Sequence, residues 1–163
     1  MTKATLYEKL KNKEVKCFAC NHGCLVSEGK TGICGVRKNL KGELYLMVYN
    51  KPIAVNIDPI EKKPLFHFLP GQGVFSLGTI GCNFGCEFCQ NWDISQLSKK
   101  PEVDILKILE ETQEWSAERI IDYCLSNNLQ IIAYTYNEPT IWTEYALEIM
   151  KLARKNGIKN VWV

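Results

Sequence analysis

A chain of 163 residues has the length of one ordinary domain and can bury a substantial core. Its composition, 46% hydrophobic and 23% charged, is that of a soluble globular protein, and a net charge of +2 is too small to indicate binding to nucleic acid or to an anionic membrane. No apolar run approaches the roughly 20 residues of a membrane span. The first residues also lack the apolar core of a signal peptide, so we expect a cytoplasmic protein with no nucleic-acid or membrane partner.

The N-terminal quarter of the chain shows little periodic structure. Residues 1–40 are basic, rich in glycine and cysteine, and poor in long apolar patterns. Residues 43–50 are suited to a pleat and predict a strand. Residues 58–73 contain three prolines and predict a loop. We expect Lys62 and Lys63 to be solvated and His67 to be packed; the alternatives are that the lysines meet an anionic substrate and that His67 faces the active site.

Strands and helices alternate in the remaining sequence. Strands are predicted over 73–80, 129–136 and 158–163, and helices over 103–115, 116–128 and 140–156. Ser116 is suited to an N-cap and Gly157 to a left-handed C-cap. This alternation predicts parallel β/α units with the ligand site at the carboxyl ends of the strands. Three strands neither close a barrel nor protect a sheet edge, so we expect a fragment or units supplied from elsewhere.

Cysteines are the strongest chemical signal. The chain has eight of them and no secretory signal, which favours metal binding over disulfides. Cys82, Cys86 and Cys89 follow the strand 73–80 in a loop that contains Gly81 and Gly85. Three thiolates can hold three irons of a [4Fe–4S] cluster and leave the fourth iron open to a substrate or cofactor. Buried cysteines without metal, or a zinc site that borrows a fourth ligand, are the alternatives.

A second group of cysteines lies near the N-terminus. Four thiolates suit a structural zinc ion or an auxiliary iron–sulfur cluster, and a metal would help such a glycine-rich segment to fold. His22 could replace one of them, and reduced cysteines without metal are the alternative. Cys124 falls on the apolar face of a predicted helix, where we expect it in the core. The N-terminal group is Cys17, Cys20, Cys24 and Cys34.

The C-x3-C-x2-C motif, with Phe88 before its last cysteine, resembles the signature of the radical S-adenosylmethionine (SAM) superfamily. The segments "DPIEKKPLFHFLPG", "GTIGCNFGCEFCQNWDIS", "YTYNEPTIWTEY" and "CFACNHGCLVSEGKTGICGVRKN" resemble the AmmeMemoRadiSam system radical SAM enzymes, which are similar to the pyruvate formate-lyase activating enzymes. The resemblance implies an α/β fold: the N-terminal half of a partial (β/α)6 TIM-like barrel, preceded by a cysteine-rich metal-binding subdomain. The expected boundaries are 1–42 for the subdomain, 43–72 for a strand and connecting loop, and 73–163 for the core.

The same resemblance implies the chemistry. SAM would bind the open iron of the [4Fe–4S] cluster and be cleaved reductively to a 5′-deoxyadenosyl radical, which abstracts hydrogen from an unknown substrate such as a glycyl-radical protein. The electron donor would be a flavodoxin or ferredoxin. Phe88 would lie against the adenine; the alternative is a core residue beside the cluster. Asn137, Glu138 and Pro139 would take the place of the segment that holds the amino group of SAM, although Tyr136 and Asn137 replace small residues there. The alternative is that these residues form only a strand end and a helix start, with Thr140 near the cap. A non-catalytic iron–sulfur electron carrier and a zinc-binding interaction module remain alternatives.

Overall fold

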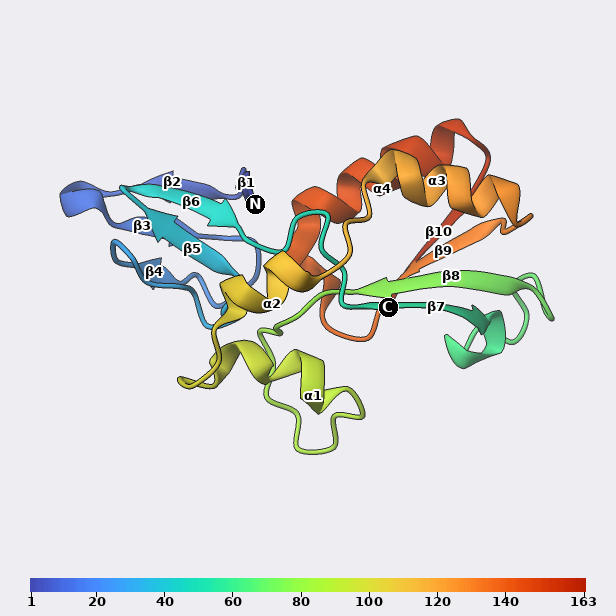
Figure 1. The fold of residues 1–163 in the computed structure, drawn as a ribbon, viewed down its shortest axis with the longest axis horizontal. Coiled ribbons are helices and arrows are strands. Elements are labelled where there is room, and N and C mark those ends of the chain that lie inside the picture. Colours follow the sequence, from blue (N-terminus) through green and yellow to red (C-terminus); the bar gives the residue numbers. More distant parts are fainter.

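The computed structural model describes residues 1–163 and has two regions (Figure 1). Short antiparallel strands form one end of the molecule, and a four-stranded sheet with helices forms the other. No helix combines the length and the apolar character that a membrane span requires. The strands are β1 (Thr2–Lys3), β2 (Tyr7–Lys9), β3 (Val15–Cys17), β4 (Leu25–Val26), β5 (Arg37–Leu40), β6 (Glu43–Leu46), β7 (Ala54–Pro59), β8 (Gly73–Gly78), β9 (Ile131–Tyr134) and β10 (Lys159–Trp162). The α-helices are α1 (Trp92–Ser95), α2 (Ile105–Glu111), α3 (Ala117–Ser126) and α4 (Thr143–Lys155), and the 3-10 helices are η1 (Lys11–Lys13), η2 (Ile60–Lys62), η3 (Leu97–Lys99) and η4 (Pro139–Trp142).

The N-terminal region consists of two three-stranded sheets, in the orders β1-β6-β5 and β2-β3-β4, with antiparallel pairing throughout. The sequence did not predict β1 to β5, because strands of two to four residues are too short to show a period. The strand predicted over 43–50 ends at Leu46, and the turn that follows places Asn50 at a φ of 60°.

The larger sheet has the order β10-β9-β8-β7. The parallel pairing of β8, β9 and β10 confirms the predicted β/α units. The loop predicted over 58–73 is wrong at its start, because Asp58 and Pro59 belong to β7 and pair antiparallel with Val74 and Gly73. Proline is tolerated there because β7 is the edge strand of the sheet.

The predicted helices are present with shorter bounds. Ser116 caps α3 by accepting a hydrogen bond from the Arg119 amide at 3.2 Å, as predicted. The helix predicted over 103–115 extends only through α2, whose N-cap is Asp104. The helix predicted over 140–156 is divided into η4 and α4, because Trp142 has a non-helical ψ of 36°. Gly157 closes α4 with the predicted left-handed φ, 74°.

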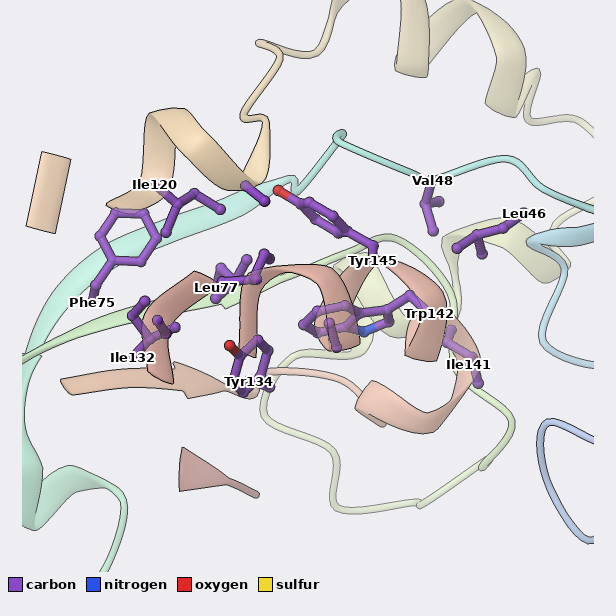
Figure 2. Packing of buried hydrophobic residues seen from close by; sticks show 14 of the residues in the cluster. Leu46, Val48, Phe75, Leu77, Ile120, Ile132, Tyr134, Ile141, Trp142 and Tyr145 are labelled. Carbon is purple, nitrogen blue, oxygen red and sulfur yellow. The ribbon is translucent and has the colours of Figure 1, made fainter. Parts of the chain in front are cut away.

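Helices α3 and α4 cover one face of the larger sheet (Figure 1). Phe75 and Leu77 of β8 and Ile132 and Tyr134 of β9 point toward them (Figure 2). Cys124 is fully buried in this cluster of 22 residues, as predicted. Leu46 and Val48 belong to the same cluster, so the N-terminal region contributes to the core of the larger sheet (Figure 2). A smaller cluster, which contains Val15, Val26 and Leu44, lies within the N-terminal region itself. The other face of the sheet carries a smaller cluster, which contains Ile60, Val74, Ile131, Ala133 and Val161.

Candidate functional site

The loops that follow β8 and β9 meet at the carboxyl ends of these strands, where parallel β/α proteins place their ligand sites. The buried side chain of Asn137 joins them. Its Nδ2 donates to the carbonyl of Gly81 at 2.6 Å and to Thr79 Oγ1 at 3.1 Å. Its Oδ1 accepts from the Thr79 amide at 3.3 Å and from Trp142 Nε1 at 3.1 Å. The cysteine loop and the segment Thr135–Pro139 therefore form one structural unit.

The cysteine loop begins with a sharp turn at Gly81, whose φ of 89° belongs to the left-handed region. A Cβ at this position would lie 2.6 Å from the carbonyl oxygen of Cys34, so a larger residue does not fit. Cys82 is buried, Cys89 is half-buried and Cys86 is exposed. The Phe84 amide donates to Cys82 Sγ at 3.5 Å, and Cys89 Sγ lies 3.4 Å from Ser95 Oγ.

These residues fit a [4Fe–4S] cluster in their chemistry but not yet in their arrangement. Three thiols lie on one loop, and one backbone N–H already points at a sulfur, as in iron–sulfur proteins. However, nowhere do three His, Cys, Asp or Glu side chains lie together in a way that could hold a metal ion. A cluster could bind to these three thiols only if the side chains of this loop converged.

The four N-terminal cysteines lie around β3 and β4. Cys17 is the last residue of β3, and its amide donates to the carbonyl of Cys24 at 2.9 Å. Burial raises the pKa of the Cys17 and Cys34 thiols, whereas Cys20 and Cys24 are half-buried. All the cysteines of the chain are free, and the four are not gathered into a metal site.

The remaining predicted SAM residues lie at different places. The Glu138 carboxylate caps η4 by accepting from the Thr140 amide at 3.2 Å, and Pro139 is the first residue of η4. Phe88 is 87% exposed and belongs to none of the core clusters, so the alternative of a core residue is wrong. The stacking of Phe88 on adenine stays a prediction.

One hollow of the molecule does not lie near this chemistry. It measures about 620 Å³ and lies beside β7, with Ile53, Phe75 and Trp115 in its wall. A hollow of about 520 Å³ is more relevant to function, because it lies between three segments: the N-terminal cysteine loop, the cysteine loop after β8 and the predicted SAM segment. Its lining includes Phe18, Cys20 and His22 of the N-terminal loop, Asn83 and Phe84 of the cysteine loop, and Glu138 and Thr140. His22 Nε2 lies 3.0 Å from the carbonyl oxygen of Asn83, so the N-terminal loop contacts the cysteine loop directly.

Several residues of the site could not be recognised in the sequence. Asn91 Nδ2 donates to the carbonyl of Tyr136 at 2.9 Å, which adds a second tie between the two loops. The expectation that Lys63 is solvated is wrong: its side chain is only 4% exposed and pairs with Asp58 at 2.7 Å. The expectation of a packed His67 is also wrong, because His67 is exposed in the loop after η2. No local sequence pattern predicts these contacts and exposures, because each depends on how distant segments pack.

Another buried ion pair fixes the N-terminal region to α4. Arg37 of β5 donates through Nη1 and Nη2 to the Glu144 carboxylate at 3.0 and 2.5 Å, and through Nε to the carbonyl of Ile141 at 2.8 Å. Burial by itself would raise the pKa of Glu144, but the hydrogen bonds and charge of Arg37 outweigh it and lower that pKa. Because α4 follows η4 directly, this pair anchors the helices next to Glu138.

Sequence comparisons identify the family of the chain. The profile of the radical SAM superfamily matches residues 77–163, from the end of β8 to the end of the chain. Uncharacterized protein MJ0808 of Methanocaldococcus jannaschii is 42% identical over the whole chain, which spans 46% of that relative. Uncharacterized protein MJ0674 of the same organism is 32% identical over 91 residues, which are 55% of the chain and 22% of that relative.

The chain thus spans less than half the length of these two curated relatives. No solved structure matches it significantly. The superfamily profile covers more than half of the chain and includes both loops that Asn137 joins. The chain therefore belongs to the radical SAM superfamily, a class of enzymes that use a [4Fe–4S] cluster and SAM.

Proposed function

We propose that this chain carries the cluster loop and part of the SAM site of a radical SAM enzyme that abstracts hydrogen from its substrate. The observation that carries the proposal is the side chain of Asn137, which binds Gly81 at the start of the cysteine loop at 2.6 Å. It holds the predicted cluster ligands and the predicted SAM segment at adjoining strand ends.

Each predicted ligand has a role in this proposal. Cys82, Cys86 and Cys89 would hold the cluster, which when bound supplies one electron to cleave SAM into methionine and a 5′-deoxyadenosyl radical. Asn137, Glu138 and Pro139 would orient the amino group of SAM, because the carboxylate of Glu138 and nearby carbonyls accept hydrogen bonds from an ammonium. Phe88 is exposed and free to cover the adenine.

The finer assignments rest on the resemblance of the motifs. We place the chain among the AmmeMemoRadiSam system radical SAM enzymes, similar to the pyruvate formate-lyase activating enzymes, with a glycyl-radical protein as substrate and a flavodoxin or ferredoxin as electron donor. Residues 1–42 would be the cysteine-rich subdomain, 43–72 the connecting segment, and 73–163 the first half of a partial (β/α)6 barrel. The parallel order of β8, β9 and β10 supports the barrel assignment.

The decisive experiment is anaerobic reconstitution of the chain with iron and sulfide. After reduction with dithionite, we expect a [4Fe–4S] EPR signal that changes when SAM is added, and formation of 5′-deoxyadenosine. Cys86→Ala should abolish both signals, because it removes one of the three proposed cluster ligands. Cys86 is exposed, so its replacement does not disturb the core. Cys124→Ala is the matched control, because this cysteine is buried away from both groups, and it should retain both signals.

The same experiment separates the alternatives. A cluster whose EPR signal is indifferent to SAM would support a non-catalytic electron carrier instead. A protein that takes up zinc and no iron would support a zinc-binding interaction module. SAM cleavage that persists in Cys86→Ala would contradict the proposed ligands.

For the N-terminal group we propose a separate metal site on Cys17, Cys20, Cys24 and Cys34, with zinc or an auxiliary iron–sulfur cluster. Cys17 ends β3 and its amide donates to the carbonyl of Cys24, the residue before β4, which supports a shared site. The variant with alanine at Cys82, Cys86 and Cys89 should still contain metal by elemental analysis. If it contains none, this second site does not exist.

A further inference from the structure

Tyr136 occupies a backbone conformation that a tyrosine rarely adopts. It follows the end of β9 with a φ of 70°, in the left-handed region that favours glycine. Such strain persists only where surrounding contacts hold it, and it concentrates at functional sites. Tyr136 also stands where the resembled SAM segment has a small residue, so the question is what its side chain contributes.

The side chain of Tyr136 crosses β8 to reach β7. Its hydroxyl donates to Asp58 Oδ2 at 2.6 Å and accepts from Asn56 Nδ2 at 3.2 Å. Asn56 and Asp58 lie opposite Ser76 and Val74 in the antiparallel register, on the face of the sheet that α3 and α4 do not cover. The tyrosine therefore spans β9, β8 and β7 on this face of the sheet, which we call the open face because α3 and α4 do not cover it.

Gly78 makes room for this crossing. A Cβ on Gly78 would lie 2.4 Å from the carbonyl oxygen of Thr135 and 2.9 Å from Cβ of Tyr136. Any larger residue in β8 would displace the tyrosine or its backbone. The absence of a side chain at Gly78 and the presence of a large one at Tyr136 are thus complementary.

Two lysines fix the receiving carboxylate. Lys62 and Lys63, at the end of η2, pair with Asp58 at 2.8 and 2.7 Å, and Lys63 Nζ lies 4.8 Å from the centroid of the Tyr136 ring. Burial alone would raise the pKa of Asp58, but the two lysines and the Tyr136 hydroxyl outweigh it and hold that pKa well below its usual range. Burial and the hydrogen bond to Asp58 raise the pKa of Tyr136 to about 12, so its hydroxyl keeps the proton that it donates.

The other end of Tyr136 belongs to the candidate site. Its carbonyl accepts from Asn91, just beyond the cysteine loop, and the next residue is Asn137, which binds Gly81. We propose that the contact of Tyr136 with Asp58 and Lys63 is an anchor that sets the left-handed backbone at Tyr136 and so positions Asn137 and Glu138 for SAM. Tyr136 is then a positioning residue, and the inference rests on the proposed function of this segment.

The test compares Tyr136→Phe, Tyr136→Gly and Asp58→Asn with the control Tyr134→Phe. Tyr134 is also a tyrosine at the end of β9, but its hydroxyl donates to Asn160 at 2.8 Å, away from Asp58. Hydrogen exchange of the unreconstituted chain is the first readout. The Thr79 amide, which donates to Asn137 Oδ1, should exchange about tenfold faster in the three anchor variants and not in the control.

SAM affinity of the reconstituted chain is the second readout, measured from the SAM-dependent change in the EPR signal. Loss of the anchor should weaken binding about tenfold while the signal without SAM stays the same. Tyr136→Gly is the sharpest variant, because it relieves the backbone strain and removes the anchor together. If the tyrosine is merely tolerated, this variant should bind SAM as well as the wild type or better.

The outcomes distinguish this inference from the proposed function. Unchanged exchange at Thr79, or unchanged SAM affinity in all three anchor variants, overturns the inference while SAM binding by the wild type upholds the function. A wild-type cluster indifferent to SAM, together with faster exchange in the anchor variants, upholds the anchor and overturns the function.

Discussion

The two faces of the larger sheet are built from alternate residues of the same strands, yet they differ in character. Phe75 and Leu77 point toward α3 and α4 and join a cluster of 22 buried residues. Val74 and Ser76, their neighbours in β8, point to the other face, where five buried apolar residues lie beside the polar contacts of Asp58. Buried apolar surface stabilises the face that α3 and α4 cover. A few hydrogen bonds and ion pairs of defined direction stabilise the open face.

This difference indicates that the two faces of the sheet have different roles. Burial of large apolar surface contributes most of the stability of a domain and tolerates small displacements poorly. Hydrogen bonds and ion pairs contribute less net free energy but fix direction. The open face carries such contacts next to the strand ends where the cysteine loop and Asn137 lie. We therefore expect changes on the covered face to alter folding, and changes on the open face to alter the site.

The largest expected effect is on the covered face. Phe75 is fully buried and its ring packs 5.5 Å from that of Trp115 and 5.6 Å from that of Tyr123. Phe75→Ala should lower the free energy of unfolding by about 3–5 kcal/mol, because it leaves a cavity. Val74→Ala, the adjacent residue on the open face, should cost only about 1.5 kcal/mol, for the two carbon groups removed. Urea titrations of both variants measure the difference in the free energy of unfolding. Equal losses in the two variants would contradict the contrast between the two faces.

The next effect concerns the buried carboxylate on each side. Glu144→Gln should cost about 3–5 kcal/mol at pH 7, because it leaves Arg37 buried and unable to give up its proton. Asp58→Asn should cost less, since Lys62 is 60% exposed and can turn to water, and the buried Lys63, unlike an arginine, can give up its proton. Both folded-state pKa values are depressed, so the unfolded chain takes up protons first as the pH falls.

The stability that these carboxylates contribute should therefore be complete above about pH 5 and be lost progressively below it. Unfolding by urea at pH 7, 5, 4 and 3 measures this loss. Each of the two substitutions should weaken the dependence of the free energy of unfolding on pH, because it removes one of the two carboxylates. A wild-type protein whose stability is the same at pH 3 and pH 7 would contradict the assignment of both ion pairs.

The sequence predicted the covered face better than the open one, for a physical reason. The strands β8 to β10, the N-cap Ser116, the C-cap Gly157 and the buried Cys124 all follow from patterns within a few residues. The open face depends on contacts across long separations, such as the 78 residues between Asp58 and Tyr136. No local rule could show that Lys63 is buried, or that β7 adds an antiparallel edge.

The candidate site divides in the same way. The spacing of Cys82, Cys86 and Cys89 placed three thiols on one loop at a strand end, and the structure has that loop there. It could not reveal Asn91 or the role of Asn137 as a tie, because both act on the backbone of another segment. The three thiols do not lie together in a metal site, and in the proposed function they would gather only when the cluster binds, since metal binding and local folding are coupled.

At Gly78 we expect a smaller effect on stability than in Phe75→Ala or Glu144→Gln, together with an effect on the site. In Gly78→Ala the new Cβ would lie 2.4 Å from the carbonyl oxygen of Thr135, which is backbone and cannot turn away. The strand end must shift, so we expect a loss of about 1–3 kcal/mol, typical of overpacking. Gly85→Ala in the cysteine loop is the control: its Cβ meets nothing within 4 Å, and the change should stay within about 0.5 kcal/mol. Because the displaced atoms belong to Thr135 and Tyr136, Gly78→Ala should also speed hydrogen exchange of the Thr79 amide, whereas Val74→Ala, with a loss of stability of similar size, should not. Equal exchange in the two variants would mean that the open face responds to lost stability alone and that its directed contacts do not position the site.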